Sequence, residues 1–455
     1  MITKKQLTNI SENVIIKISD STGKPVLLNI SKYEKDLLAS AAYNINWAGF
    51  CTKITLKQKR YGEAGVCTLN FSLVSSYGAI GKSKKNSVIP NPIQLGDKVT
   101  ITLNDKLDLA AYFDMGTDSL SNMKDVKYKT FFVGYVWNMK TNALGEVEIT
   151  CYDLLKYLQN QRAFFSYKNA DTGSVIIKEA LSSLNLGKGE NNIKLQLDMT
   201  LLNNYIAQTT GTEEKIFVYD KNFIDVVNWI INRALTSAAT VDLGFATYIL
   251  FMVDYETNSI VIGSSDKLGR IAAYTLSYDS MFTSCELSES IENDVFNTIY
   301  SGVDVVGTDI GEMAWGIGTE TNSLKQLGTL PHYERFSESD FLTENSTLTQ
   351  EIAADIIKKM VLLKSKPKVK LSIKSYGNPY LHAGMQVPIK LPESMIGGLG
   401  TIFAPSAMVV KDTPIVLIDE ISHTITNNTM EMDFTSSVLL NNYVKWNSVD
   451  YRKID

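Results

Sequence analysis

The sequence predicts a β-rich α+β protein, in which two antiparallel β-modules flank an α/β insert and the C-terminal module carries one long helix. Three observations predict this class. Apolar and polar residues alternate with a period of two in the first third of the chain and again towards its end. Between these parts the period changes to that of amphipathic helices. The length of 455 residues corresponds to about three domains.

Strand patterns dominate the N-terminal module. Residues 66–74 alternate as in a half-buried strand, and their apolar face carries Cys67, Leu69, Phe71 and Leu73. Three further strand-like segments are joined by short connections, namely 94–103, 131–139 and 145–153. Together they favour a small antiparallel sheet or barrel. Two stretches rich in turn-forming residues, 78–93 and 114–125, predict loops.

Helical periodicity marks the middle of the chain. Asp153 can cap a short helix over 153–161, and a second helix over 174–187 is expected to end at Gly187. The clearest helix is predicted over 222–236, with apolar residues at positions i, i+3 and i+4; they are Phe223, Val226, Val227, Ile230, Ile231 and Ala234. Two strands, 246–255 and 258–264, follow and complete the predicted insert.

Strand character returns after residue 270, first at 298–306. Residues 307–346 are polar and Gly-rich, and they predict mainly a long loop. A capping box at Thr347 and Gln350 opens a helix over 347–363. The remaining predicted strands are 369–375, 385–391, 415–426 and 429–437, and Asn427-Asn428 is expected to form a hairpin turn between the last two.

These elements predict the organisation of the whole chain. The segments are an N-terminal segment 1–45, a first β-domain 46–161, an α/β insert 162–268, a second β-domain 269–440 with loop 307–346 and helix 347–363, and a C-terminal tail 441–455.

Charge and composition exclude several functional classes. With 44 Lys and Arg against 49 Asp and Glu, the net charge is −5, and no global positive field for stable nucleic-acid binding is present. No apolar run is long enough for a membrane helix, and the N-terminus lacks the features of a signal peptide. We therefore expect synthesis in the cytoplasm without membrane insertion. The four cysteines lack zinc-ribbon spacing and are expected to be buried thiols; they are Cys51, Cys67, Cys151 and Cys285.

The sequence contains no recognisable motif for catalysis, a metal or a cofactor, and we predict that the protein is not an enzyme. His332, His382 and His423 each lack a neighbouring partner pattern, and His423 is expected on the polar face of its strand. Gly316 and Gly318 form a bare GxG, without the strand and helix that a phosphate loop requires.

Two groups of charged residues stand out. An acidic group is expected to be a solvated face rather than a catalytic pair; it comprises Glu286, Glu289, Glu292 and Asp294. Alternating lysines would line one face of a strand; they are Lys364, Lys366, Lys368 and Lys370. Such lysines commonly solvate a face or protect a sheet edge. The alternative is a basic stripe for an acidic partner, so these four residues are our interface candidates.

Several segments together resemble the central baseplate hub proteins of contractile phage tails and phage-tail-like bacteriocins, in the Gram-positive branch. The segment 145–181 is similar to the family's strand, D-x-L-x-Y-L helix and following helix; the matching residues are Asp153, Leu155, Tyr157 and Leu158. Thr172-Gly173 stands where the family has Thr-Ala. The segment 220–231 is similar to the family's helix after a Tyr-Asp strand end.

The resemblance continues in order along the chain, over about residues 45–440. Segments 291–304 and 324–336 resemble the family's N-x-V and S-I-x-x-Y-G motifs, with Leu327 in place of the Tyr. The last match covers 378–390 and 415–435, and its fitting residues are Gly384, Val387, Ile418, Ile421, His423 and Ile425.

This resemblance implies two tube-like β-barrel domains in each chain and a homotrimeric ring. The ring would join the sixfold tail tube to the threefold central spike, contact other baseplate proteins and form part of the channel in a phage or bacteriocin particle. His423 would be a structural strand residue. For a channel that DNA passes, we expect a neutral or acidic lining, with the lysines of 364–370 facing elsewhere.

Two other functions remain open at this point. A tail-associated cell-wall hydrolase would release wall fragments, although the sequence shows no lytic motif. A distal-tail or receptor-binding module would bind a glycan or a host surface, and it would be expected to expose an aromatic patch.

Overall fold

The computed structural model describes most of the chain. The described residues are 10–26, 47–75, 87–88, 91–104, 128–168, 171–184, 193–203, 215–236, 249–272, 275–278, 282–290, 295–304, 313–319, 321–337, 357, 361, 368–378, 380–392, 415–427 and 429–437.

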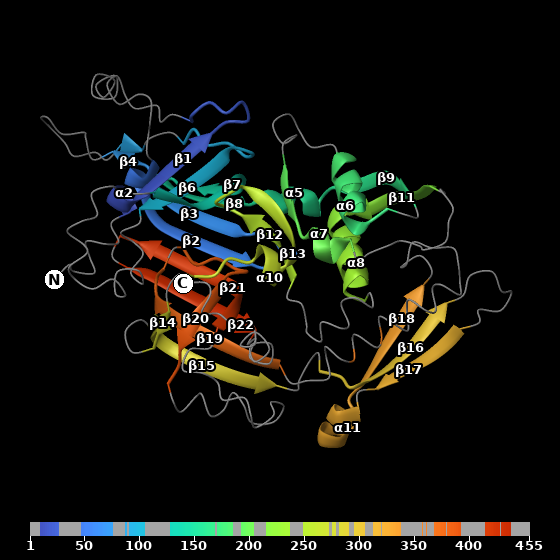
Figure 1. Ribbon diagram of the computed structural model, residues 1–455. Coiled ribbons are helices and arrows are strands. Elements are labelled where there is room, and N and C mark those ends of the chain that lie inside the picture. Colours follow the sequence, from blue (N-terminus) through green and yellow to red (C-terminus); the bar gives the residue numbers. More distant parts are fainter. Residues whose placement is uncertain are drawn as a thin grey trace, which may run out of the picture.

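A twelve-stranded curved sheet is the main feature of the fold (Figure 1). Ten strands follow one another in the order β1-β6-β7-β8-β3-β2-β21-β22-β19-β15, and β14 and β20 lie off this path. The N-terminal strands are β1 (Val14–Ser19), β2 (Cys51–Lys59), β3 (Val66–Ser72), β6 (Lys98–Asn104), β7 (Tyr128–Thr141) and β8 (Glu146–Tyr152). The C-terminal strands are β14 (Leu276–Ser277), β15 (Phe282–Ser290), β19 (Lys368–Tyr376), β20 (Gln386–Lys390), β21 (Ile415–Thr426) and β22 (Met430–Ser437).

The two halves of this sheet come from opposite ends of the chain. They meet where β2 pairs antiparallel with β21, from Lys53 opposite Thr426 to Lys59 opposite Glu420. The β-rich α+β class is therefore confirmed, and the structure adds that the strands of the two β-modules form one continuous sheet. We call it the shared sheet.

Between the two halves, the chain forms a layer of helices and small sheets. Helix α5 (Leu154–Gln159) begins at Asp153 as predicted, and α6 (Gly173–Ser182) ends before Ser183 rather than at Gly187. Helix α8 (Phe223–Thr236) buries its predicted apolar stripe. The other elements are β9 (Arg162–Lys168), β10 (Lys194–Leu197), α7 (Met199–Leu202), β11 (Lys215–Asn222), β12 (Ile249–Asp254), β13 (Ser259–Ser264) and α10 (Ser265–Leu268).

A three-stranded sheet in the C-terminal half corrects the predicted loop over 307–346. Strands β17 (Met313–Thr319) and β18 (Pro331–Ser337) both pair with β16 (Thr298–Asp304), and α11 (Thr321–Leu327) connects them. The prediction failed because glycines and polar residues indicate a loop, although Met313, Trp315 and Ile317 alternate with small residues along β17 as in a strand. The predicted helix 347–363 lies outside the described residues except for Ile357 and Val361, which are helical and buried.

Small elements complete the described parts. Helix α2 (Ile10–Asn13) leads into β1, which adds an unpredicted strand to the sheet by pairing with β6. The remaining elements are the 3-10 helix η1 (Trp47–Phe50) and the short strands β4 (Val74–Ser75) and β5 (Ser87–Val88), which pair with each other. The predicted loop 114–125 and the tail 441–455 lie outside the described residues, and the predicted domain boundaries stay a prediction.

Two large apolar clusters hold these parts together. One joins the N-terminal half of the shared sheet to the helical layer without a break, from Ile10 to Ile262, and also includes Ile425 and Met430. The second fills the C-terminal half, around Leu371, Val387 and Phe434. Because burial of apolar side chains is the main favourable term in folding, the helical layer is stabilised chiefly against the first half.

Candidate functional surface of the shared sheet

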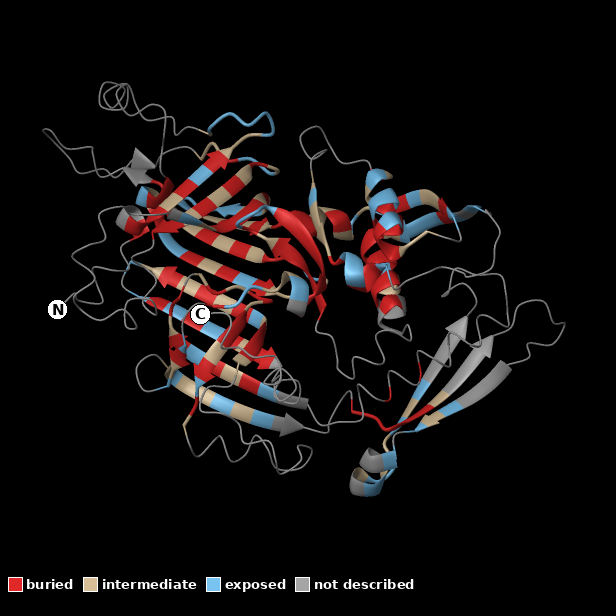
Figure 2. Cartoon of the chain, in the orientation of Figure 1, coloured by how far each residue is buried: buried red, intermediate tan, exposed pale blue. Residues whose placement is uncertain are grey.

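One face of the shared sheet carries mainly polar residues. A single row of directly opposed residues crosses all ten strands of the path, and none of its members is buried. The row runs Ser19, Lys98, Tyr135, Tyr152, Val66, Lys57, Ser422, Asp433, Lys374 and Ser284. We call the face that carries this row the polar face. Figure 2 shows the alternation of buried and exposed residues along these strands.

The opposite face is apolar because side chains alternate along a strand. The neighbouring row consists of Val136, Cys151, Cys67, Leu56, His423 and Met432, and each of them is nearly or fully buried. The sheet thus has one face that builds the core and one whose crossing row contains no buried residue.

Acidic and basic side chains are interspersed on the polar face. Lys374 lies directly opposite Asp433, and Lys59 lies opposite Glu420. Glu286 occupies the adjoining edge strand β15, opposite Ser372. Such mixing of signs gives the face no strong field of either sign.

The structure separates the four interface candidates. Lys370 lies exposed on the polar face, opposite Ser288 and Ser437, and Lys368 lies on the same strand in the same phase. Lys364 and Lys366 lie outside the described residues. The role of these lysines at an interface stays a prediction.

The structure describes two residues of the acidic group. Glu286 is exposed on the polar face, and Glu289 pairs with Val369 on the same strand, β15. Glu292 and Asp294 lie outside the described residues. In the part of the chain that the structure describes, no three His, Cys, Asp or Glu residues gather in a way that could hold a metal ion.

Two side chains connect the two halves of the shared sheet and the helical layer. They belong to Gln58, in β2, and to Arg60, directly after β2. Buried Gln58 donates to the carbonyl of Val253 on β12 at 3.1 Å and accepts from the N–H of Ala383 at 3.1 Å. Arg60 forms an ion pair with Asp419 and donates to the carbonyl of Ile249 at 2.8 Å. Each residue thereby connects the N-terminal half to both other parts.

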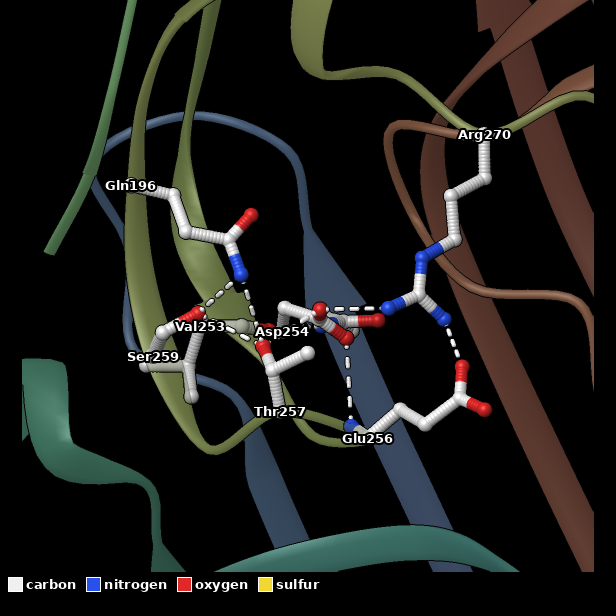
Figure 3. Close-up of polar contacts among 8 residues, drawn as sticks. Gln196, Val253, Asp254, Glu256, Thr257, Ser259 and Arg270 are labelled. Atoms are coloured by element: carbon white, nitrogen blue, oxygen red, sulfur yellow. Dashed lines mark hydrogen bonds and ion pairs between the residues drawn. The ribbon is translucent and has the colours of Figure 1, made fainter. Parts of the chain in front are cut away.

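A second link fastens the helical layer to the start of the C-terminal half (Figure 3). The guanidinium of Arg270 pairs with Asp254 at 2.6 Å and with Glu256, both at the turn between β12 and β13. The backbone carbonyl of Arg270 accepts a hydrogen bond from the N–H of Gln386, at 2.8 Å. Thr257 donates to the same Asp254 carboxylate at 2.6 Å, which fixes its orientation.

His423 is not on the polar face, which corrects the prediction. It is fully buried, and its Nε2 lies 2.9 Å from the carbonyl oxygen of Leu381. The signal was present in the sequence, because His423 alternates in phase with the apolar residues Ile421 and Ile425. Burial lowers the pKa of His423 to about 3, so the imidazole is neutral and structural.

The other two histidines also contact aromatic rings. His382 is buried with its pKa lowered to about 4 by desolvation, and its ring packs edge-on to Tyr255 at 5.8 Å between centroids. His332 stacks on Phe296 at 4.4 Å.

Asp153 is the most perturbed described carboxyl group. It is fully buried, and desolvation raises its pKa to about 7. It accepts hydrogen bonds from the N–H of Gly65 at 2.8 Å, the N–H of Leu155 at 3.0 Å and the hydroxyl of Tyr255 at 3.2 Å. These partners account for its position as a helix cap and give the group a structural role.

Gly318 is explained by packing rather than by phosphate binding. A Cβ atom at this position would lie 2.5 Å from Cγ2 of Ile357, so only glycine lets the helix approach β17 closely. Gly316 lies on the same strand, opposite Ser301. Among the described residues, no helix is long and apolar enough to cross a membrane.

Comparison with known proteins shows which family the sequence matches. The sequence matches the family described as YQBQ-like over residues 54–436, which includes most of both halves of the sheet and the helical layer. A search among curated proteins finds no match.

Several solved structures are similar. The 43 kDa tail protein of prophage MuSo2 from Shewanella oneidensis superposes with a TM-score of 0.52 at 12% identity, covering 93% of this chain and 98% of that one. The tail protein from Neisseria meningitidis MC58 gives 0.49 at 10% identity, covering 93% and 96%. Prophage tail protein gp18 from Listeria monocytogenes EGD-e gives 0.45 at 8% identity, covering 96% and 99%. At such low sequence identities these structures show a similarity of fold alone. The match to the MuSo2 tail protein, with a TM-score of 0.52, establishes this similarity.

Proposed function

The chain belongs to the YQBQ-like family, and from this membership and its tail-protein fold we propose that it is the structural baseplate hub of a contractile tail or injection particle. Three copies form a ring that joins the sixfold tail tube to the threefold central spike and forms part of the channel. The particle is a phage or a phage-tail-like bacteriocin, and other baseplate proteins contact the ring. The protein has no catalytic role and needs no cofactor.

The observation that carries this proposal is the row of ten directly opposed residues across the shared sheet, none of which is buried and most of which are polar. A wide curved sheet with a core on one side and a hydrated face on the other suits the wall of a water-filled tube. Each chain supplies two half-sheets in tandem, so three chains supply six such units around the ring. Mixed charge on the polar face would let a charged cargo pass without strong binding.

This assignment differs from the expectation that the alternating lysines face away from the channel. Lys370 lies on the polar face and would face the lumen, where Lys374 and Asp433 lie directly opposite each other. The proposed lining is therefore mixed in charge rather than acidic.

Site-directed labelling tests the proposed orientation. In a Cys285→Ser background, Lys57→Cys would place a thiol on the polar face, and Leu144→Cys would place one on the exposed turn between β7 and β8. A bulky polymer-linked maleimide is expected to react with both thiols in the monomer, but much more slowly with Lys57→Cys in the assembled ring. Equal labelling of both in a ring would contradict the lumenal assignment.

Wall hydrolysis is the competing function that an assay can address directly. Purified protein incubated with bacterial cell wall is expected to release no soluble fragments above the level of a heat-denatured sample. Reproducible release would replace the structural proposal with a hydrolase.

A further inference from the structure

A second surface, on strands β9 and β11 of the helical layer, exposes three aromatic side chains. Strands β9 and β11 pair antiparallel, with Phe165 opposite Val218, and these two side chains and Tyr167 lie on the side that packs against the helices. Phe164 and Phe217 point to the other side because side chains alternate. The exposed fractions of Phe164, Phe217 and Tyr219 are 57%, 57% and 69%.

Phe217 and Tyr219 form an ordered platform on this side. Their rings are stacked, with centroids 6.1 Å apart and planes 18° apart. Large exposed aromatic side chains that lie together are typical of interaction sites, since their exposure to water is unfavourable. Aromatic residues are also enriched among those that contribute most to binding.

Two lysines lie at one end of the same face. Lys168 and Lys215 are directly opposite each other and exposed. Like charges in this position destabilise a strand pair. Neither ammonium forms an ion pair with a described residue, and the Asp171 carboxylate accepts from the backbone N–H of Lys168 at 2.7 Å. At the other end, Arg162 is already paired with Asp220 at 3.7 Å.

We propose that this aromatic face, defined as Phe164, Phe217, Tyr219, Lys168 and Lys215, docks an acidic, aromatic-bearing segment of another protein. Carboxylates of the partner neutralise the opposed lysines, and its aromatic side chains cover the platform. In the complex, the partner's carboxylates thus remove the repulsion between the two ammonium groups, which persists in the free chain.

Charge argues against two other occupants of this face, a nucleic acid and a second copy of this chain. Residues 162–268 contain nine Lys and Arg against twelve Asp and Glu, so this region lacks the positive field that nucleic-acid binding requires despite its aromatic platform. A twofold contact between two copies would bring lysine against lysine, because such an interface is formed by the same patch on both chains.

Fluorescence polarisation with defined polymers tests this proposal on the full chain. The probe is a labelled random copolymer of glutamate and tyrosine, compared with polyglutamate of equal length and with labelled oligothymidylate. We expect the copolymer to bind most tightly. The K168E/K215E and F217S/Y219S variants are each expected to weaken that binding by about tenfold or more.

Two matched variants serve as controls. K178E reverses an exposed charge on α6, and L144S removes an exposed apolar side chain from the β7–β8 turn. Both are expected to change the affinity by less than about twofold. An equal loss of binding in the controls, or tighter binding of oligothymidylate, would overturn the proposal.

The mass of each variant separates this inference from the proposed hub function. Light scattering is expected to give the wild-type oligomeric mass for K168E/K215E and F217S/Y219S. A reduced mass would show that the aromatic face is a contact between copies of this chain and would overturn docking of a different protein. If the wild type is monomeric but still binds the copolymer, this result would contradict the proposed ring and would not contradict the docking proposal.

Discussion

The N–H of Ala383 donates to the side-chain carbonyl of Gln58 at 3.1 Å, across 325 positions of sequence. The amide group of the same side chain donates to the carbonyl of Val253. One buried glutamine thus connects the first half of the sheet, the helical layer and the second half.

Replacing Gln58 by Ala is expected to destabilise the protein by about 1–3 kcal/mol, because the Val253 carbonyl and the Ala383 N–H lose their buried partner. Urea unfolding measures this change. Lys57→Ala, one residue away on the exposed face, is the control and should change stability little. Equal effects of the two variants would argue against the junction.

Arg60 and Asp419 are expected to stabilise each other more than a surface ion pair does. Their side chains are 20% and 26% exposed, whereas those of Lys140 and Glu148 are 74% and 45% exposed. A double-mutant cycle with alanine should give a coupling of about 1 kcal/mol for the first pair and close to zero for the second. Similar couplings for both pairs would contradict the special role of the first.

Gly384 is expected to tolerate no side chain. Its φ of +79° lies in the left-handed region, and a Cβ would lie 2.8 Å from the sulfur of Met252. Gly384→Ala should therefore reduce the free energy of unfolding by at least about 1–2 kcal/mol. Gly49→Ala is the matched control, because a Cβ there meets no atom within 4 Å. Calorimetry of both variants checks the difference.

Acid is expected to destabilise the folded chain through its buried histidines. The pKa values of His382 and His423 are about 4 and about 3, whereas the unfolded rings titrate near about 6.5. Below that pH the unfolded state binds more protons, so stability falls as the pH falls towards about 4. Asp153 opposes this trend, because its raised pKa of about 7 makes the folded state the better proton acceptor below that pH.

Two imidazoles outweigh one carboxyl group, so the net loss on acidification should remain. Urea midpoints measured between about pH 4 and 6.5 should fall with the pH for the wild type. They should fall more steeply for Asp153→Asn, in which the opposing group is absent. The His382→Gln and His423→Gln double variant should lose the decline, and an unchanged decline would assign it to other groups.

The thiols are expected to be unreactive in the folded protein. Desolvation raises the pKa of Cys51 to about 12, and the pKa values of Cys67 and Cys151 lie well above the usual range. Cys285 is less buried, and its pKa is raised to about 11. Since the thiolate is the nucleophile, a maleimide reagent should label Cys285 slowly and the other three only after unfolding. Rapid labelling of a Cys285→Ser variant would show that the core opens.

Local patterns predicted local structure well in this chain. The apolar stripe of α8 and the strand around Leu69 are where periodicity places them, because burial of one face imposes that pattern. The pairing of β2 with β21 is different, since no property of either strand alone specifies its distant partner. Strands β17 and β18 of the small sheet were missed for a related reason, because glycines interrupt β17 and neither strand alone indicates its pairing with β16, which the sequence did predict as a strand.

The candidate surfaces were predictable only in part. The alternation of Lys368 and Lys370 with apolar residues predicts a common face, and in the structure Lys370 is exposed on the polar face. The aromatic face could not be predicted, because it depends on β9 and β11 pairing across about fifty intervening residues, with α6 and α8 on one side only.

The most direct test of the proposed ring is the mass of the purified protein by light scattering, combined with class averages of negatively stained particles. The proposal predicts a trimeric mass at micromolar concentrations and a threefold ring with a six-lobed outline and a central channel. A compact monomer without a channel across the same concentrations would contradict it.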